Sequence, residues 1–170
     1  MQLDIMTLPN FLGIGVMRAG TTWLYAQLRT HKQVYISPQK ELNFFTDFYD
    51  RGIGWYSGHF PSAQEAVQYK AIGEITPTYI ADPDAPARIR AHMPESRLIV
   101  MLRNPVDRAY SEYTKTLRNF NFKGTFADFV AQSKNVLDRG YYTEQLERSK
   151  CNRGSMLPTS RDCLNYIHQP

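Results

Sequence analysis

The sequence is poor in the residues that build metal sites and covalent frameworks. It contains two cysteines, Cys151 and Cys163, both near the C-terminus, and four histidines whose spacing matches no metal-binding motif. One possible cysteine pair does not make a disulfide framework. We therefore predict no metal site, no disulfide-stabilised scaffold and a cytoplasmic location.

Long apolar runs and dense charge are also missing. No apolar stretch approaches the roughly 20 residues that cross a bilayer, and the N-terminus lacks the basic and apolar regions of a secretory signal. The 20 Lys and Arg exceed the 16 Asp and Glu without forming a dense basic run. We expect no membrane span and no nucleic-acid partner; the oligomeric state stays open. The mild positive charge suits an anionic ligand and, equally, an ordinary solvated surface.

What is present favours an α/β fold. Across the 170 residues, hydrophobic residues make up 42% and charged residues 21%, which is typical of a globular protein. Short apolar runs predict buried strands at Phe11–Val16, Val34–Ile36, Ala71–Glu74 and Leu98–Leu102. Helical patterns lie between and after them, near residues 20–30, 40–47, 84–92, 105–119, 126–136 and 141–148. This alternation predicts a parallel sheet with helices on both faces, whose ligands bind beyond the carboxyl ends of the strands.

A glycine loop, residues 15–22, joins the first predicted strand to the first predicted helix. Gly15 and Gly20 keep the spacing of a phosphate-binding loop, but Thr21 stands where the usual lysine would follow the second glycine. Thr22 keeps the hydroxyl position, and Arg18 supplies a cation inside the loop. Amides at the start of the helix favour an anion there. A strand-to-helix turn without a ligand is the alternative interpretation of this loop alone.

Three further segments follow the glycine loop in order: Ser37–Phe45, which contains Lys-Glu-Leu-Asn-Phe-Phe, then Gly73–Tyr79 and Arg97–Tyr113. With the loop they resemble the sulfotransferase family that uses 3′-phosphoadenosine 5′-phosphosulfate (PAPS), in particular its heparan-type and bacterial branch. The resemblance runs from about residue 11 to residue 148. It implies a P-loop-like sulfotransferase architecture without a metal. It also implies transfer of a sulfuryl group to a hydroxyl or amine of a small molecule or sugar.

The resemblance also implies roles for individual residues. Arg103 and Ser111 match the pair that holds the 3′-phosphate of the donor. Glu41 matches the proposed general base, a role that burial of the carboxyl would favour. Arg18 would stabilise the leaving phosphate oxygen, since group transfer of this kind depends on positioning and charge stabilisation. The residues that match the 5′-phosphosulfate loop are Arg18, Ala19, Gly20, Thr21, Thr22 and Trp23.

Several of these positions have simpler alternatives. Glu41 also suits a helix cap, and Arg103 also suits an ion pair with Asp107 at a helix start. Trp23 fits either a donor-flanking role or the core. Glu74, at a strand end facing the predicted site, also suits a structural hydrogen bond to the loop. The aromatic residues Phe44, Phe45 and Tyr49 are expected in the core rather than under a substrate.

Some positions depart from the family pattern. Arg18 stands where the heparan-type enzymes usually carry lysine, and Ile75 stands where many of them carry a second lysine. The second change makes a sulfated-glycan acceptor less favoured. From Ser149 the resemblance stops. We therefore expect a partial sulfotransferase-like domain at residues 1–148, incomplete at its C-terminus, and a divergent, poorly packed tail at residues 149–170.

Two other functions remain open at this point. A truncated, non-catalytic relative would retain weak binding of PAPS or of PAP, its desulfated product, or none, and would act only through association. A phosphate-loop kinase or NTPase is disfavoured, because Thr21 replaces the lysine and no clear acidic residue follows a strand for metal binding.

Overall fold

The computed structural model describes residues 6–138, with side chains to residue 133. The described residues divide after Leu102 into two compact units, an α/β unit and a helical unit. The predicted helix at residues 141–148 and the predicted tail at residues 149–170 lie outside the described residues.

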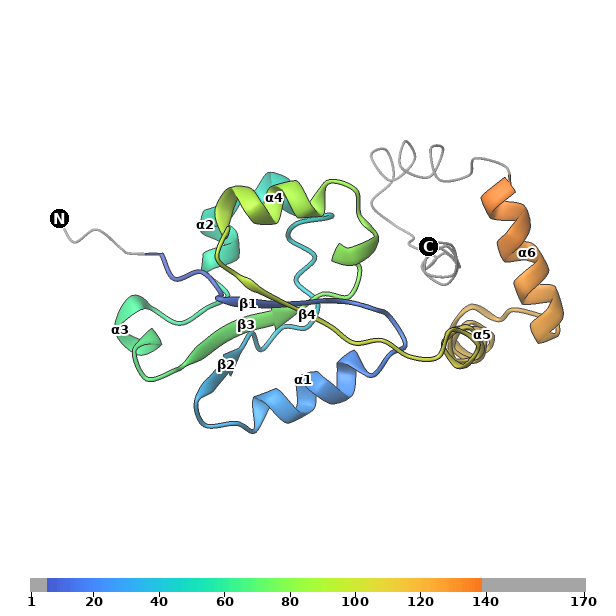
Figure 1. The fold of residues 1–170 in the computed structure, drawn as a ribbon, viewed down its shortest axis with the longest axis horizontal. Coiled ribbons are helices and arrows are strands. Elements are labelled where there is room, and N and C mark those ends of the chain that lie inside the picture. Colours follow the sequence, from blue (N-terminus) through green and yellow to red (C-terminus); the bar gives the residue numbers. More distant parts are fainter. Residues whose placement is uncertain (1–5, 139–170) are drawn as a thin grey trace. The chain divides into compact units, whose positions relative to one another are not determined.

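Four parallel strands form the sheet of the first unit in the order β2-β3-β1-β4 (Figure 1). The predicted parallel sheet is therefore confirmed, and each predicted strand end lies within two residues of the observed one. Leu12 of the inner strand pairs with Glu74 on one side and with Leu98 on the other. The strands are β1 (Phe11–Gly15), β2 (Val34–Ile36), β3 (Ala71–Ile75) and β4 (Arg97–Val100).

Helices cover both faces of this sheet, as predicted. Figure 1 shows α1 on one side and α2 and α4 on the other. Phe11 and Leu12, neighbours in β1, belong to two different buried clusters, because successive side chains of a strand point to opposite faces. The helical elements are α1 (Thr21–Arg29), η1 (Tyr49–Arg51), α2 (Gly52–Ser57), α3 (Ala63–Ala66), η2 (Tyr79–Ala81) and α4 (Ala85–His92).

The predicted short helix at residues 40–47 is wrong. This stretch forms turns, and Asn43 has a left-handed backbone with φ 51°. The amides of Asn43 and Phe44 bond to side-chain hydroxyls of Thr76 and Tyr79 instead of helical carbonyls. Tertiary hydrogen bonds therefore override the local helical pattern. We call residues 40–45 the Glu41 segment; Phe44 and Phe45 within it are fully buried, which confirms their predicted core role.

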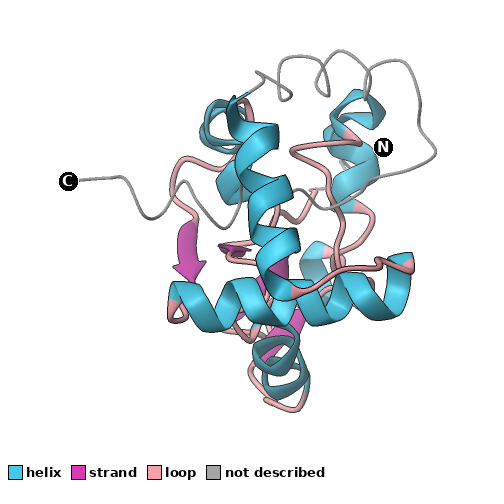
Figure 2. Ribbon diagram, turned by 90° about the vertical axis from the view of Figure 1, so that its right-hand side faces the viewer, coloured by secondary structure: helices cyan, strands magenta, loops and turns pink. Residues whose placement is uncertain are grey.

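The second unit contains α5 (Pro105–Phe120) and α6 (Phe126–Asp138), both of which were predicted. Figure 2 shows them toward the viewer, crossing each other. Asn104 caps α5 by accepting hydrogen bonds from the amides of its first turn. Tyr113 of α5 contacts the rings of Phe126 and Phe129 on α6. Its hydroxyl donates to the Gly124 carbonyl at 2.8 Å, so aromatic contacts join the two helices and a partly buried hydrogen bond ties α5 to the connection between them.

The packing of β3 against β1 gives a testable prediction. Gly73 lies opposite Phe11 in the sheet, and an added Cβ would overlap the Phe11 ring. We expect Gly73→Ala to lower the free energy of unfolding by about 1–3 kcal/mol, the usual cost of overpacking, in urea denaturation.

The matched control is Gly54→Ala in α2, where an added Cβ meets nothing within 4 Å. This change is expected to leave stability unchanged or raised, because alanine favours a helix over glycine. Equal losses in both variants would contradict the close approach of Gly73 to Phe11.

Candidate functional site

The glycine loop lies at the carboxyl end of β1, between Gly15 and the start of α1. The Val16 amide donates to the Met101 carbonyl at 3.0 Å, and the Met101 amide donates to the Gly15 carbonyl at 2.8 Å. These bonds continue the pairing of β1 beyond the last residue of β4. The backbone then takes left-handed conformations at Arg18 (φ 65°) and Gly20 (φ 95°). Glycine adopts such a φ without strain, which explains its place at the sharp turn into α1.

The N-terminus of α1 faces the end of this turn and carries the features of an anion site. Its first helical hydrogen bond runs from the Leu24 amide to the Gly20 carbonyl. A helix leaves its first-turn amides without an intrahelical acceptor, and its dipole makes this end positive. No acidic residue lies in the first turn. Thr21 is buried there, whereas Trp23 is 63% exposed, so the core alternative for Trp23 is wrong.

Glu41 lies beside this helix start. The Lys40 ammonium is 2.8 Å from Glu41 Oε1 and 3.4 Å from the Thr22 hydroxyl oxygen. A single cation therefore joins the Glu41 segment to the first turn of α1. Glu41 caps no helix, so that alternative is wrong. The burial that would favour a base role is absent, because the side chain remains 36% exposed and is paired with Lys40.

Lys40 is a site residue that the sequence analysis missed. It lay within the Lys-Glu-Leu-Asn-Phe-Phe motif, but only the glutamate received a role. Its side chain is largely covered, with 17% exposed, and its ammonium lies between a candidate base and a loop hydroxyl. The feature that could have identified Lys40 is its position directly before Glu41. Its contact with Thr22 joins residues 18 positions apart, which no sequence spacing predicts.

Glu74, on β3, is a buried carboxylate that is linked to the Glu41 segment through the hydroxyls of Thr76 and Tyr79. It is 1% exposed and accepts bonds from the hydroxyls of Tyr79 (2.6 Å), Thr76 (2.7 Å) and Tyr56 (3.1 Å). The backbone amide of Leu42 also favours its charged form. Burial raises the pKa of Glu74, and the four donors offset part of that rise. Glu74 thus makes structural hydrogen bonds, but the alternative that placed them on the glycine loop is wrong: within the described residues they come from Tyr56, Thr76 and Tyr79.

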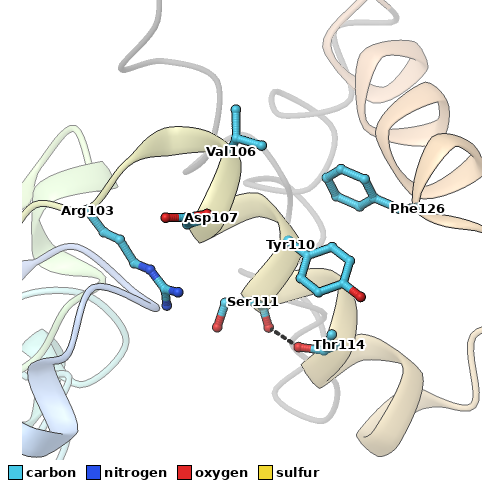
Figure 3. Close-up of a pocket in the computed structure, with 7 residues that line it drawn as sticks. All are labelled: Arg103, Val106, Asp107, Tyr110, Ser111, Thr114 and Phe126. Carbon is cyan, nitrogen blue, oxygen red and sulfur yellow. Dashed lines mark hydrogen bonds between the residues drawn. The ribbon is translucent and has the colours of Figure 1, made fainter.

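The second unit holds the other predicted pair, Arg103 and Ser111, in a pocket of about 340 Å³. In Figure 3, Arg103, Asp107 and Ser111 lie on one side of the α5 ribbon, and Tyr110 and Phe126 lie on the other. The pocket thus combines a guanidinium and a hydroxyl with two aromatic rings whose centroids are 5.4 Å apart. The residues that line it are Arg103, Val106, Asp107, Tyr110, Ser111, Thr114 and Phe126.

Comparison with protein families matches residues 8–162 to the family described as "Sulfotransferase domain". The chain belongs to this sulfotransferase family. The family resemblance predicted from the motifs is therefore confirmed, and it counts against the alternative of a phosphate-loop kinase. None of the helices within residues 6–138 is long and apolar enough to cross a membrane.

Individual sulfotransferases show the extent of the similarity. The chain is 39% identical over 109 residues to "Membrane-associated sulfotransferase kil1" of Dictyostelium discoideum, covering 64% of this chain and 23% of that protein. It is 35% identical over 149 residues to "Heparan sulfate glucosamine 3-O-sulfotransferase 3B1" of Homo sapiens, covering 82% and 37%. The chain thus spans well under half of these relatives.

A solved structure supports the same fold assignment. The crystal structure of a sulfotransferase from Alicyclobacillus acidocaldarius matches with a TM-score of 0.67 and 26% identity. The match covers 78% of this sulfotransferase-family chain and 60% of the other. The predicted α/β sulfotransferase architecture is therefore confirmed.

The burial of Glu74 predicts a specific pH dependence of stability. Its folded pKa is raised above the ordinary value of 4.5, so folding favours the protonated carboxyl. This contribution is complete below the unfolded pKa and is lost as the pH rises through the folded pKa. The free energy of unfolding of the parent, minus that of Glu74→Gln, should therefore fall with rising pH in urea titrations.

Glu65 provides a control of opposite sign. The Ser62 side chain and backbone amide lower the pKa of this exposed carboxyl. Its contribution is present above the unfolded pKa and is lost as the pH falls through the folded pKa. The corresponding difference for Glu65→Gln should rise with pH. A rise for Glu74→Gln as well would show that hydrogen bonding outweighs burial at Glu74.

Proposed function

We propose that this chain binds PAPS and transfers its sulfuryl group to a hydroxyl or amine acceptor. The observation that carries the proposal is the Lys40 bridge, which brings the candidate base Glu41 to the Thr22 hydroxyl of the glycine loop. Family membership and relatives named as sulfotransferases support the reaction class. The acceptor is assigned only by chemistry, as a small molecule or sugar that presents a nucleophilic oxygen or nitrogen.

The glycine loop fits the sulfated end of the donor. The start of α1 offers amides and a positive helix end, and its first turn is free of acidic side chains. Arg18 adds a guanidinium, which forms charge-assisted hydrogen bonds to phosphate oxygens. When bound, PAPS supplies the sulfuryl group and a phosphate leaving group. The loop residues hold that phosphate in place and stabilise the charge that develops on it.

Lys40 supplies a second cation at the same place. Heparan-type enzymes usually carry lysine where this chain has Arg18, and many carry one where it has Ile75, so an ammonium is absent from both of those positions. The Lys40 ammonium has three donor hydrogens. Two of them are accounted for by Glu41 and Thr22, and we assign the third to an oxygen of the transferred group.

Glu41 acts as the base in this proposal. Lys40 bonds its Oε1 atom, and the other carboxylate oxygen is assigned to the proton of the acceptor hydroxyl or amine. As the acceptor oxygen or nitrogen forms its bond to sulfur, its proton passes to Glu41 and the bond to the phosphate oxygen breaks. The partial exposure of Glu41 suits an acceptor that arrives from solvent.

The pocket of the second unit is assigned to the 3′-phosphate. Arg103 and Ser111 offer a guanidinium and a hydroxyl, both of which bind phosphate oxygens. This assignment rests on the motif match and on the fact that both residues line one pocket. It is independent of the Lys40 bridge and can be tested by itself.

Replacing Arg103 tests that assignment. Arg103→Ala should weaken PAP binding by roughly 1.5–3 kcal/mol, the scale of a charge-assisted hydrogen bond, in isothermal titration without metal. Arg118→Ala is the control, because Arg118 is an exposed residue of α5 that does not line the pocket. Parent-like PAP binding in Arg103→Ala, or tighter binding of ATP with Mg²⁺ than of PAP, would refute the assignment.

Replacing Glu41 tests the chemistry. Glu41→Gln should bind PAP like the parent but transfer sulfate from labelled PAPS at least about 100-fold more slowly, since the amide cannot accept the proton. Glu65→Gln, on exposed α3, is expected to behave like the parent. An active Glu41→Gln variant would remove Glu41 from the role of base.

A further inference from the structure

The Glu41 segment has no regular secondary structure, so its buried amides need partners elsewhere. Two consecutive amides find them on residues that follow β3, and the Leu42 amide before them stabilises the charged form of Glu74. The Asn43 amide donates to Thr76 Oγ1 at 3.3 Å, and the Phe44 amide donates to the Tyr79 hydroxyl at 3.0 Å.

Glu74 also fixes the direction of both hydroxyls. Thr76 donates its only hydroxyl proton to Glu74 Oε2 at 2.7 Å, and Tyr79 donates its own to Oε1 at 2.6 Å. Because each hydroxyl has a single proton, its lone pairs are then directed to the segment amides. One buried carboxylate therefore controls two successive amides, each through a hydroxyl.

The same strand end is tied to the strand that leads into the glycine loop. The Thr76 amide donates to the Gly13 carbonyl at 2.9 Å, and Glu74 pairs with Leu12 in the sheet. Thr76 therefore links two segments: its amide bonds to Gly13 of β1, and its hydroxyl accepts from the amide of Asn43. Strands of a packed sheet are rigid supports for such a link.

We propose that Glu74 is a positioning residue for Glu41. Through Thr76 and Tyr79 it fixes the backbone immediately after Glu41, and it thereby holds the Glu41 carboxylate and Lys40 against Thr22. This inference rests on the proposed role of Glu41 as the base. The anchoring of residues 42–44 by Glu74 is a separate physical statement and has its own measurement.

Tyr56 supplies a matched control. Its hydroxyl also donates to Glu74 Oε1, at 3.1 Å, and its side chain is as fully buried as Tyr79. Among the hydrogen bonds of the described residues, however, it reaches none of the amides of residues 42–44. Tyr56→Phe therefore removes a bond to Glu74 without releasing the segment.

The experiment compares Tyr79→Phe, Thr76→Val and Tyr56→Phe in the full 170-residue chain. Amide hydrogen exchange should accelerate about tenfold at Phe44 in Tyr79→Phe and at Asn43 in Thr76→Val, the equivalent of one lost hydrogen bond. In Tyr56→Phe these amides should exchange as in the parent. Thr76→Ser keeps the hydroxyl and is expected to restore the protection of Asn43.

Turnover provides the functional readout. The kcat for sulfuryl transfer from PAPS should fall by roughly 10- to 100-fold in Tyr79→Phe and Thr76→Val, while PAP binding stays within twofold of the parent. Tyr56→Phe and Thr76→Ser should keep the parent kcat. Glu74→Gln should lower both the exchange protection of the segment amides and kcat. The glutamine NH₂ group is a hydrogen-bond donor and cannot accept the protons that the Thr76 and Tyr79 hydroxyls donate to Glu74.

The outcomes separate the two proposals. Unchanged exchange at residues 42–44 in Tyr79→Phe and Thr76→Val, or an equal loss of kcat in Tyr56→Phe, would overturn the positioning role of Glu74. If exchange follows the prediction but the parent transfers no sulfate, the proposed function fails and the anchoring of the segment is supported.

Discussion

The buried carboxylate of Glu74 is the interaction on which the site depends. A charged group in the interior is costly unless hydrogen bonds compensate it, and here three hydroxyls and the Leu42 amide offset part of that cost. The compensation has a structural result. It draws the turns after β2 onto the end of β3, so residues far apart in sequence form one rigid support beside the glycine loop. Removing the carboxylate would leave several buried donors without an acceptor.

Charge at the loop comes from three separate sources. The start of α1 contributes aligned amides, Arg18 contributes a planar guanidinium, and Lys40 contributes an ammonium that arrives from the turns after β2. This division distinguishes the chain from the usual phosphate loop, in which one lysine follows the second glycine. It also explains how Thr21 can occupy the lysine position while the site retains positive charge.

The strands of the sheet could be predicted from the sequence, but the contacts between the loops that follow them could not. Short apolar runs located the four strands within residues 6–138, because strands of a parallel sheet are rich in apolar residues. The expected burial of the last run was wrong, since Leu98 in β4 is 52% exposed. The helix predicted over residues 40–47 failed, since the amides of Asn43 and Phe44 bond to residues more than 30 positions away. The Lys40 bridge was invisible for the same reason. Motif matching found Glu41, but not that it stays partly exposed and paired.

The pairing of Lys40 with Glu41 has a consequence for selectivity. The charges of an ammonium and a carboxylate 2.8 Å apart largely cancel at long range, so the pair does little to attract an anion toward the protein. At contact distance the two charges act separately. Salt screens interactions beyond a Debye length of about 8–10 Å and affects shorter ones less. The pair therefore acts on a group in contact with it, and salt weakens this action less than it weakens long-range attraction.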